Sequence, residues 1–259
     1  MQSLNFRHKF NLYWPKITVL CLALVINYGS FAQNKASENL ADYDNQWIHY
    51  GFQIGLHQSK YRIQYADVYT SSTLDTLHSV IPGSLPGWKV GFVSNMRLLQ
   101  YLDFRALVIV GFYEHDLTYR FTDGREIREL KDATLVEIPL LLKYKSARRG
   151  NVAMYAVGGI NTAFEAAGKG DEFDVEQNIE LRNWNFSIDA GIGFDLYYPL
   201  FKFSPEIRYT WGLRNMLTPE SSDYTLPLKR LTYQNIAFYI SFEGGPSYLR
   251  KKKNKRPKR

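Results

Sequence analysis

Two neighbouring segments of the chain alternate apolar and polar residues so regularly that both predict β-strands. In residues 184–197 apolar side chains occupy every even position, and in residues 201–213 they occupy every odd position. Successive side chains on a strand point to opposite faces, so each segment has one apolar and one polar face. A helix would scatter the same residues around its circumference. Because only residues 198–200 separate the two segments, they predict an antiparallel hairpin.

Residues 1–32 have the parts of a secretory signal peptide. A basic leader precedes an apolar core at 17–26, and a small-x-small sequence at 30–32 precedes Gln33. The core is too short to span a bilayer, which makes a transmembrane anchor the less favoured alternative. The single cysteine, Cys21, lies in this core. The mature chain is therefore predicted to contain neither disulfides nor thiolate metal sites.

The same alternation predicts eight strands across the remaining chain. They lie near 47–57, 87–98, 101–114, 134–145, 151–164, 184–197, 201–213 and 232–243. The strand near 151–164 is rich in Gly and Ala, so its two faces are not assigned. Long connections at 58–86, 115–133, 165–182 and 214–231 alternate with short turns at 99–100, 146–150 and 198–200.

This alternation of long and short connections is typical of outer-membrane barrels, with long loops outside and short turns in the periplasm. We therefore predict an all-β fold, an eight-stranded antiparallel transmembrane β-barrel over residues 47–243. An even number of strands places both termini on the periplasmic side. Residues 33–46 are then an N-terminal periplasmic segment.

A soluble, lipocalin-like ligand-binding barrel is the alternative fold, because it also alternates apolar and polar residues. Two features favour the membrane barrel. The polar faces carry mostly small residues and few charges, as expected of a crowded lumen. Aromatic residues gather towards the ends of the strands, as in the interfacial girdles of membrane barrels. These aromatics are Trp47, Trp88, Tyr144, Trp184, Tyr209 and Trp211, of which Trp47 is on the opposite register from its apolar neighbours.

The polar faces also place charged residues of both signs in the predicted lumen. The inward candidates are Arg105, Glu137, Lys143, Asp189, Glu206 and Arg208. An eight-stranded barrel leaves an interior that side chains fill, so these charges are expected to pair. We interpret them as structural packing. A proton or ion path is the weaker alternative, because a filled barrel conducts poorly.

No catalytic, metal or cofactor motif is evident in the sequence. The histidines are scattered without metal-ligand spacing, and no small-molecule substrate is indicated. His115 and Asp116 at a strand end could form half of a hydrolase dyad, although such a pair is usually part of a solvated loop. A small lipid-modifying or proteolytic barrel enzyme remains the alternative function, and it would need an acid–base–nucleophile cluster at one rim.

The formal net charge of +7 arises largely from the C-terminal end of the chain. Residues 244–259 are predicted to be a basic, disordered tail, because a block of like charges repels itself. Its basic residues are Arg250, Lys251, Lys252, Lys253, Lys255, Arg256, Lys258 and Arg259. This tail could bind anionic lipid, lipopolysaccharide phosphates or an acidic protein. Nucleic acid is not an expected partner of an exported chain.

Several strand sequences resemble one known family. The similar segments are 47–52, 138–144, 155–159, 189–195 and 201–209, of which the Phe-Lys-Phe-Ser-Pro-Glu-Ile-Arg run is the most specific. Together they resemble the PorT family of Bacteroidetes outer-membrane barrels, called SprT in gliding bacteria. The resemblance covers most of residues 47–243. It implies an accessory, non-enzymatic role in type IX protein secretion and gliding motility. The implied partners are outer-membrane lipid and proteins of the secretion machinery.

Overall fold

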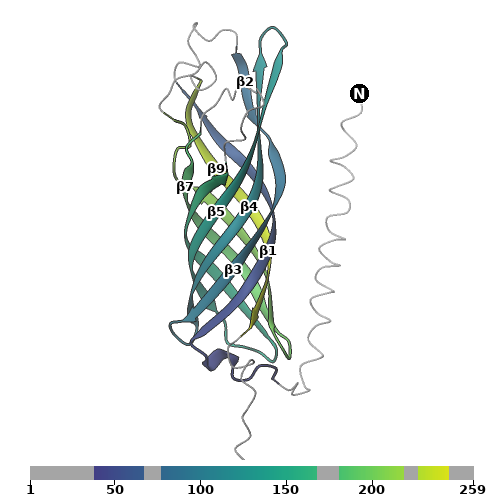
Figure 1. The fold of residues 1–259 in the computed structure, drawn as a ribbon, viewed down its shortest axis with the longest axis vertical. Helices are drawn as coiled ribbons and strands as arrows, with labels where there is room; N and C mark the ends of the chain where they lie inside the picture. The colour runs from purple at the N-terminus through teal and green to yellow at the C-terminus, as the bar shows by residue number, and fades with distance from the viewer. Residues whose placement is uncertain (1–37, 67–76, 168–180, 219–226, 245–259) are drawn as a thin grey trace, which may run out of the picture. The chain divides into compact units, whose positions relative to one another are not determined.

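The computed structural model describes residues 38–66, 77–167, 181–218 and 227–244 (Figure 1). The predicted signal peptide lies outside these residues, as does the basic tail beyond Gly244. The chain divides into two compact units, Met1–Glu38 and Asn39–Arg259, and all the strands belong to the second. Among the described residues, no helix is long and apolar enough to cross a membrane.

The described residues contain nine strands, eight of which close into a ring. The bounds are β1 Ile48–Tyr65, β2 Leu77–Pro82, β3 Ser84–Arg97, β4 Leu102–Phe121, β5 Glu126–Lys145, β6 Val152–Ala167, β7 Trp184–Tyr197, β8 Lys202–Gly212 and β9 Leu228–Gly244. The ring order is β4-β3-β1-β9-β8-β7-β6-β5, and β5 pairs with β4 to close it. All pairs are antiparallel. The predicted eight-stranded antiparallel barrel is thereby confirmed.

The two ends of the barrel differ. At one end, which we call the turn end, residues 98–101, 146–151 and 198–201 connect strands. At the other, the loop end, β4 and β5 continue together past the rest of the barrel (Figure 1). The short strand β2 adds to the far part of β4. We call this projection the arm: β2, residues 113–121 of β4 and residues 126–133 of β5.

The arm corrects two of the predicted long loops. Much of 115–133 forms a strand hairpin, and 58–86 contains the end of β1, all of β2 and the start of β3. The alternation inverts at the base of the arm. Phe112 is exposed on the outer face, whereas beyond it Leu117 and Tyr119 are buried on the inner face and the outward Glu114 is exposed. Apolar residues face outward where lipid surrounds a strand and inward where water surrounds it. The outward alternation therefore ends at the base of the arm, and the sequence pattern predicts a loop where the strand in fact continues.

A single glycine joins β2 to β3. The partners on β4 shift by one residue between Pro82–Leu117 and Trp88–Phe112, as in a β-bulge. The Gly83 N–H donates to the Asp116 carbonyl at 2.9 Å, and a Cβ on Gly83 would lie 2.6 Å from Asp116 Oδ2. Glycine therefore permits the close approach by which β2 and β3 follow β4 as one bulged strand.

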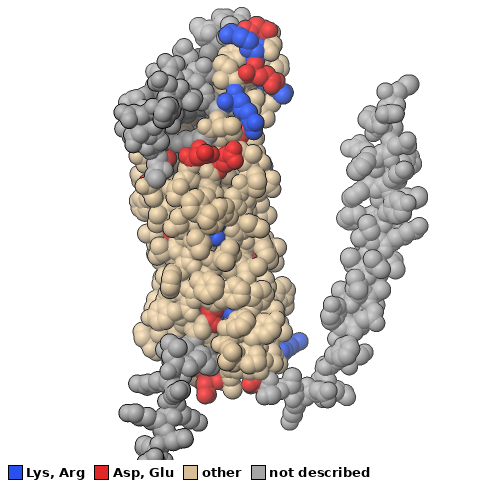
Figure 2. Space-filling view, turned by 45° about the vertical axis from the view of Figure 1, so that its right-hand side comes forward, with Lys and Arg blue, Asp and Glu red and all other residues tan. Residues whose placement is uncertain are grey.

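A broad apolar belt surrounds the barrel between its two ends. Figure 2 shows it almost free of charge, whereas Lys, Arg, Asp and Glu gather at the ends. The predicted girdle residues Trp88, Tyr144, Trp184, Tyr209 and Trp211 are all exposed. Along β3, the stretch from Trp88 to Leu98 rises about 33 Å, or about 25 Å along the axis at a tilt of about 40°. This height matches the hydrophobic band of an outer-membrane barrel.

Two facing assignments left open by the sequence are settled by the structure. Trp47 is exposed although its parity differs from that of β1, because it precedes the strand. On β6, Tyr155 and Val157 point into the lumen and Met154 points outward. Gly159 allows close approach to β5, since a Cβ at this position would overlap the Leu140 carbonyl oxygen.

Candidate functional site

The lumen holds a continuous row of buried ion pairs in which cations and acids alternate. The row runs Lys143, Asp195, Lys202, Glu243, Arg105, Glu206, Arg208 and Asp189. At its centre, the Arg105 guanidinium donates to Glu206 at 2.8 Å and to Glu243 at 3.0 Å. The Lys143 ammonium donates to Asp195 at 2.7 Å. Four cations therefore balance four acids, as a low-dielectric interior requires.

A separate ion pair lies nearer the loop end. The Lys89 ammonium donates to Glu137 Oε1 at 2.8 Å and to Oε2 at 3.1 Å. The same carboxylate accepts hydrogen bonds from the Tyr113 hydroxyl and, at 3.2 Å, from the Asn161 amide. Lys89 is 1 % exposed and forms no ion pair with a second described acid. Lys89 and Glu137 thus form an ion pair that is separate from the row.

The structure buries all six charged residues that the sequence assigned to the lumen. Five of them join the row, and Glu137 lies in the separate pair. Sequence reasoning missed four partners, which are Lys89, Asp195, Lys202 and Glu243. Each stands on the polar parity of its strand, so the same alternation could have found them. Which charged residues pair with one another depends on the tilt and register of the strands around the barrel. The sequence of a single strand does not specify these.

A short N-terminal segment packs against the turn end of the lumen. Residues 39–46 include a 3₁₀ turn at Tyr43–Asn45, and Tyr43 is 2 % exposed. The Tyr43 ring stacks on His49 with centroids 3.8 Å apart, and its hydroxyl donates to Glu243 at 3.2 Å. We call residues 39–46 the plug, because it links the mouth of the barrel to the row of ion pairs.

Polar contacts fix the plug to the strands and turns around it. The Asp44 carboxylate accepts hydrogen bonds from Lys145 at 3.2 Å and from the Tyr197 hydroxyl at 3.3 Å. The Asn39 N–H donates to the Asn151 side chain at 2.9 Å. The plug therefore belongs to the folded barrel. The alternation method missed it because the segment is neither strand nor amphipathic helix.

An apolar cluster lies across the loop end of the lumen. Its buried members are Tyr61, Val80, Leu117, Tyr119, Leu181, Leu217, Leu228 and Leu231. Leu181 and Leu217 precede β7 and follow β8, and they meet in an isolated antiparallel bridge. Leu181 and Leu217 pack with residues of β1, β2, β4 and β9, so described residues of the chain occupy both ends of the lumen.

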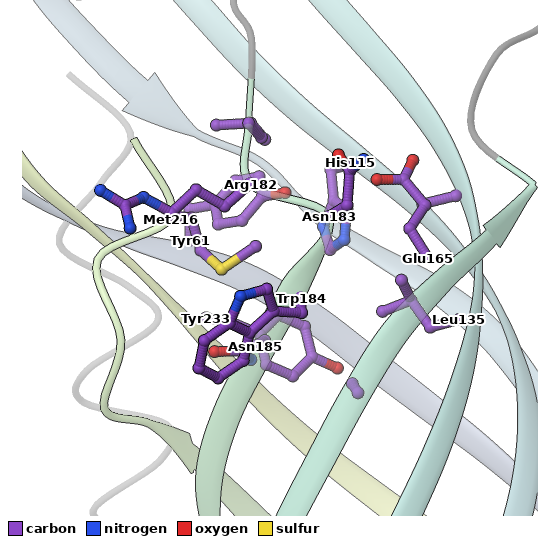
Figure 3. Close-up of a pocket in the computed structure, with 13 residues that line it drawn as sticks. Tyr61, His115, Leu135, Glu165, Arg182, Asn183, Trp184, Asn185, Met216 and Tyr233 are labelled. Carbon is purple, nitrogen blue, oxygen red and sulfur yellow. The ribbon is translucent and has the colours of Figure 1, made fainter. Parts of the chain in front are cut away.

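A pocket of about 420 Å³, part of which is open solvent, lies beside this cluster (Figure 3). Figure 3 shows Arg182 and Met216 on one side, His115 and Glu165 on the other, and Trp184 below. The His115 ring packs on Tyr61 with centroids 4.5 Å apart. The lining combines aromatic rings and aliphatic side chains with a few polar groups.

The suggested His115–Asp116 dyad does not form. Asp116 faces away from the pocket to accept hydrogen bonds from Arg128 at 3.0 Å, because adjacent strand residues point to opposite faces. Within the described ranges, no group of three or more His, Cys, Asp or Glu is arranged to hold a metal. The lumen charges instead satisfy one another.

Comparison with known proteins gives one family and several distant structures. The sequence model of a family described as "Outer membrane protein beta-barrel domain" matches residues 31–218. A search of curated proteins found no match. The outer membrane protein OprG from Pseudomonas aeruginosa is 11% identical over 76% of this chain and 93% of its own, with a TM-score of 0.44. Neisserial surface protein A is 12% identical over 75% and 96%, with a TM-score of 0.42. Ail of Yersinia pestis is 11% identical over 76% and 99%, with a TM-score of 0.33.

Proposed function

The chain belongs to the family of outer membrane protein beta-barrel domains, and on this premise we propose that it is a non-enzymatic accessory component of type IX protein secretion. Its place is the bacterial outer membrane. The proposed role is to hold protein partners of the secretion machinery at that membrane. Loss of secretion would then also affect gliding motility.

The observation that carries this proposal is the filled lumen. Alternating ion pairs occupy the interior, the plug lies at the turn end, and the apolar cluster lies at the loop end. A barrel packed in this way offers its surfaces for interaction and not a passage for solutes.

The resemblance to the PorT family supplies the specific process. Its most specific run, residues 201–209, lies on β8 and contributes Lys202, Glu206 and Arg208 to the row of ion pairs. The similar segment 189–195 contributes two of the acids that these cations meet. The resemblance therefore falls on residues that pack the lumen, which supports a shared barrel interior.

We further propose that both termini face the periplasm and that the arm faces the outside. The even number of strands in the ring and the short connections at the turn end support this orientation. The basic tail, Arg250 to Arg259, would then attract acidic surfaces of periplasmic partners. The arm would offer an outer contact surface.

A deletion strain tests the proposal. The strain is complemented with the full chain or with a matched variant in which residues 115–131 are replaced by a short turn, and secretion of type IX cargo is measured with membrane fractionation of the tagged protein. We expect the deletion to block cargo secretion and the full chain to restore it. Normal secretion in the deletion strain would refute the proposed process, and release of the protein by carbonate would refute membrane integration.

A further inference from the structure

Basic residues gather on one side of the outer rim at the loop end. Five basic residues follow one another along the adjacent strands β1, β9, β8 and β7 and their immediate extensions. We call them the basic arc, and they are Lys60, Arg62, Arg230, Arg214 and Arg182. On the other side of the ring, the exposed Glu114 and Asp132 stand directly opposite each other on β4 and β5. The arm on that side also carries arginines that pair with acids, as Arg120 does with Glu126 and Arg128 with Asp116. The basic arc therefore lies away from the arm, whose charges are of both signs.

Three of the four arginines of the arc are held in place by contacts with neutral groups. The Arg214 guanidinium lies 3.3 Å from the centroid of the Trp184 ring. Arg182 donates to the Leu217 carbonyl at 2.9 Å, and Arg230 donates to the Leu213 carbonyl at 2.6 Å. Each contact leaves other guanidinium N–H groups to bind an anion.

No arc residue forms an ion pair with another described residue. The Arg182 N–H donates to the Met216 carbonyl at 2.8 Å, which brings the segment of Arg182 beside that of Arg214. Desolvation and the like charge of Arg182 both lower the pKa of Arg214. Moreover, Arg214 Nε is buried without a hydrogen-bond partner. Paired guanidinium groups of this kind match the oxygens of a phosphate.

The arc also lies at the height of lipid headgroups. Arg182 precedes the girdle residue Trp184 by two positions, and Arg230 donates to the carbonyl of the exposed Leu213. At a tilt of about 40° two residues correspond to about 5 Å above the girdle. The headgroup layer of a bilayer begins at this height.

We propose that the basic arc binds the phosphate groups of an anionic glycolipid in the outer leaflet, with Arg182 and Arg214 as the central contacts. The inference rests on the proposed outer-membrane orientation, in which the loop end faces outward. Bound glycolipid would fix the barrel's rotation relative to neighbouring lipids and leave the arm for other contacts.

The test uses the full folded chain in neutral detergent, with bisphosphorylated and dephosphorylated lipid A as probes. Arg182→Gln/Arg214→Gln is compared with Arg120→Gln/Arg125→Gln, which removes two arginines from the arm at the same end. Gel mobility with and without heating shows that each variant is folded. We expect the first variant to lose at least tenfold in affinity for bisphosphorylated lipid A, and the control to lose less than twofold.

Three results would overturn the proposal. Equal losses in both double variants would indicate general charge attraction. Equal affinity for the two lipids, with saturable binding of inorganic phosphate alone, would indicate a site for a free anion. Loss of thermal stability with lipid affinity retained would indicate that the arc pairs with acids of the chain itself, such as the five in residues 168–180.

Orientation is measured separately, so that its failure can be recognised. Asp123→Cys at the tip of the arm places a thiol in a mature chain predicted to lack cysteine. A membrane-impermeant maleimide should label it on intact cells. Labelling only after lysis would refute the proposed orientation, whereas the detergent measurement would still decide whether the arc binds phosphorylated lipid.

Discussion

Replacing Glu137 by Gln removes the carboxylate that neutralises Lys89 inside the barrel. The Lys89 ammonium is 2.8 Å from Glu137 Oε1 and forms no other ion pair among the described residues. Removing one partner of a buried pair costs about 3–5 kcal/mol, because the remaining charge stays desolvated. Lys89→Met should cost less, about 1–3 kcal/mol, since Tyr113 and Asn161 still donate to the carboxylate.

The double variant Lys89→Met/Glu137→Gln should lose less free energy of unfolding than the two single variants lose in sum. Removing both charges eliminates the stranded ion, so we expect a coupling energy of about 3 kcal/mol. The free energy of unfolding is measured by urea titration in lipid vesicles, with tryptophan fluorescence and gel mobility as probes. The control is the exposed Arg120–Glu126 pair on the arm, for which coupling should stay below about 1 kcal/mol. Additive losses at Lys89 and Glu137, within about 0.5 kcal/mol, would refute the reasoning.

Three further predictions concern the belt, the packing of the strands and the plug. Phe194→Arg on the lipid-facing side should lower the free energy of unfolding by about 2–4 kcal/mol if the site lies near the bilayer midplane, as measured by carbonate extraction and urea unfolding. Ser187→Arg, at a buried position, should instead lower stability by disturbing the packing of the lumen. If the stability of both variants depended equally on the acyl-chain length of the lipid, this distinction would be contradicted. Gly159→Val should prevent formation of the heat-modifiable folded band, because the new Cβ would overlap the Leu140 carbonyl oxygen, and a normal band would be the contrary result. Tyr43→Ala should leave the barrel folded but expose residues 39–46 to protease, and unchanged digestion would show that Tyr43 does not hold the plug.

The barrel itself could be predicted from sequence because lipid and lumen impose opposite demands on successive residues. On β7 and β8 the alternation continues through the whole belt, and the structure follows it. The prediction failed where the surroundings of a strand change from lipid to water. After Phe112 the apolar residues of β4 lie on the inner face instead of the outer face. The arm therefore lacks the outward apolar alternation that predicts a membrane strand.

The candidate site was predictable in kind but not in its connections. Parity alone places Arg105 and Glu206 in the lumen, and electrostatics requires such charges to pair. Which charges meet depends on how β4 and β8, which are not neighbours in the ring, face each other across the interior. The contact of Tyr43 with Glu243 could not be predicted either, because it joins residues 200 positions apart whose proximity depends on the folded barrel.

The central claim, a membrane barrel whose lumen is filled and occupied at both ends, is tested most directly by conductance. Purified, heat-modifiable protein is inserted into planar lipid bilayers, and single-channel current is recorded over a range of voltages with an open porin as the positive control. The account predicts no stepwise conductance above that of the bare bilayer. Stable, reproducible channel openings would contradict it, because ions could then pass the ion pairs, the plug and the apolar cluster.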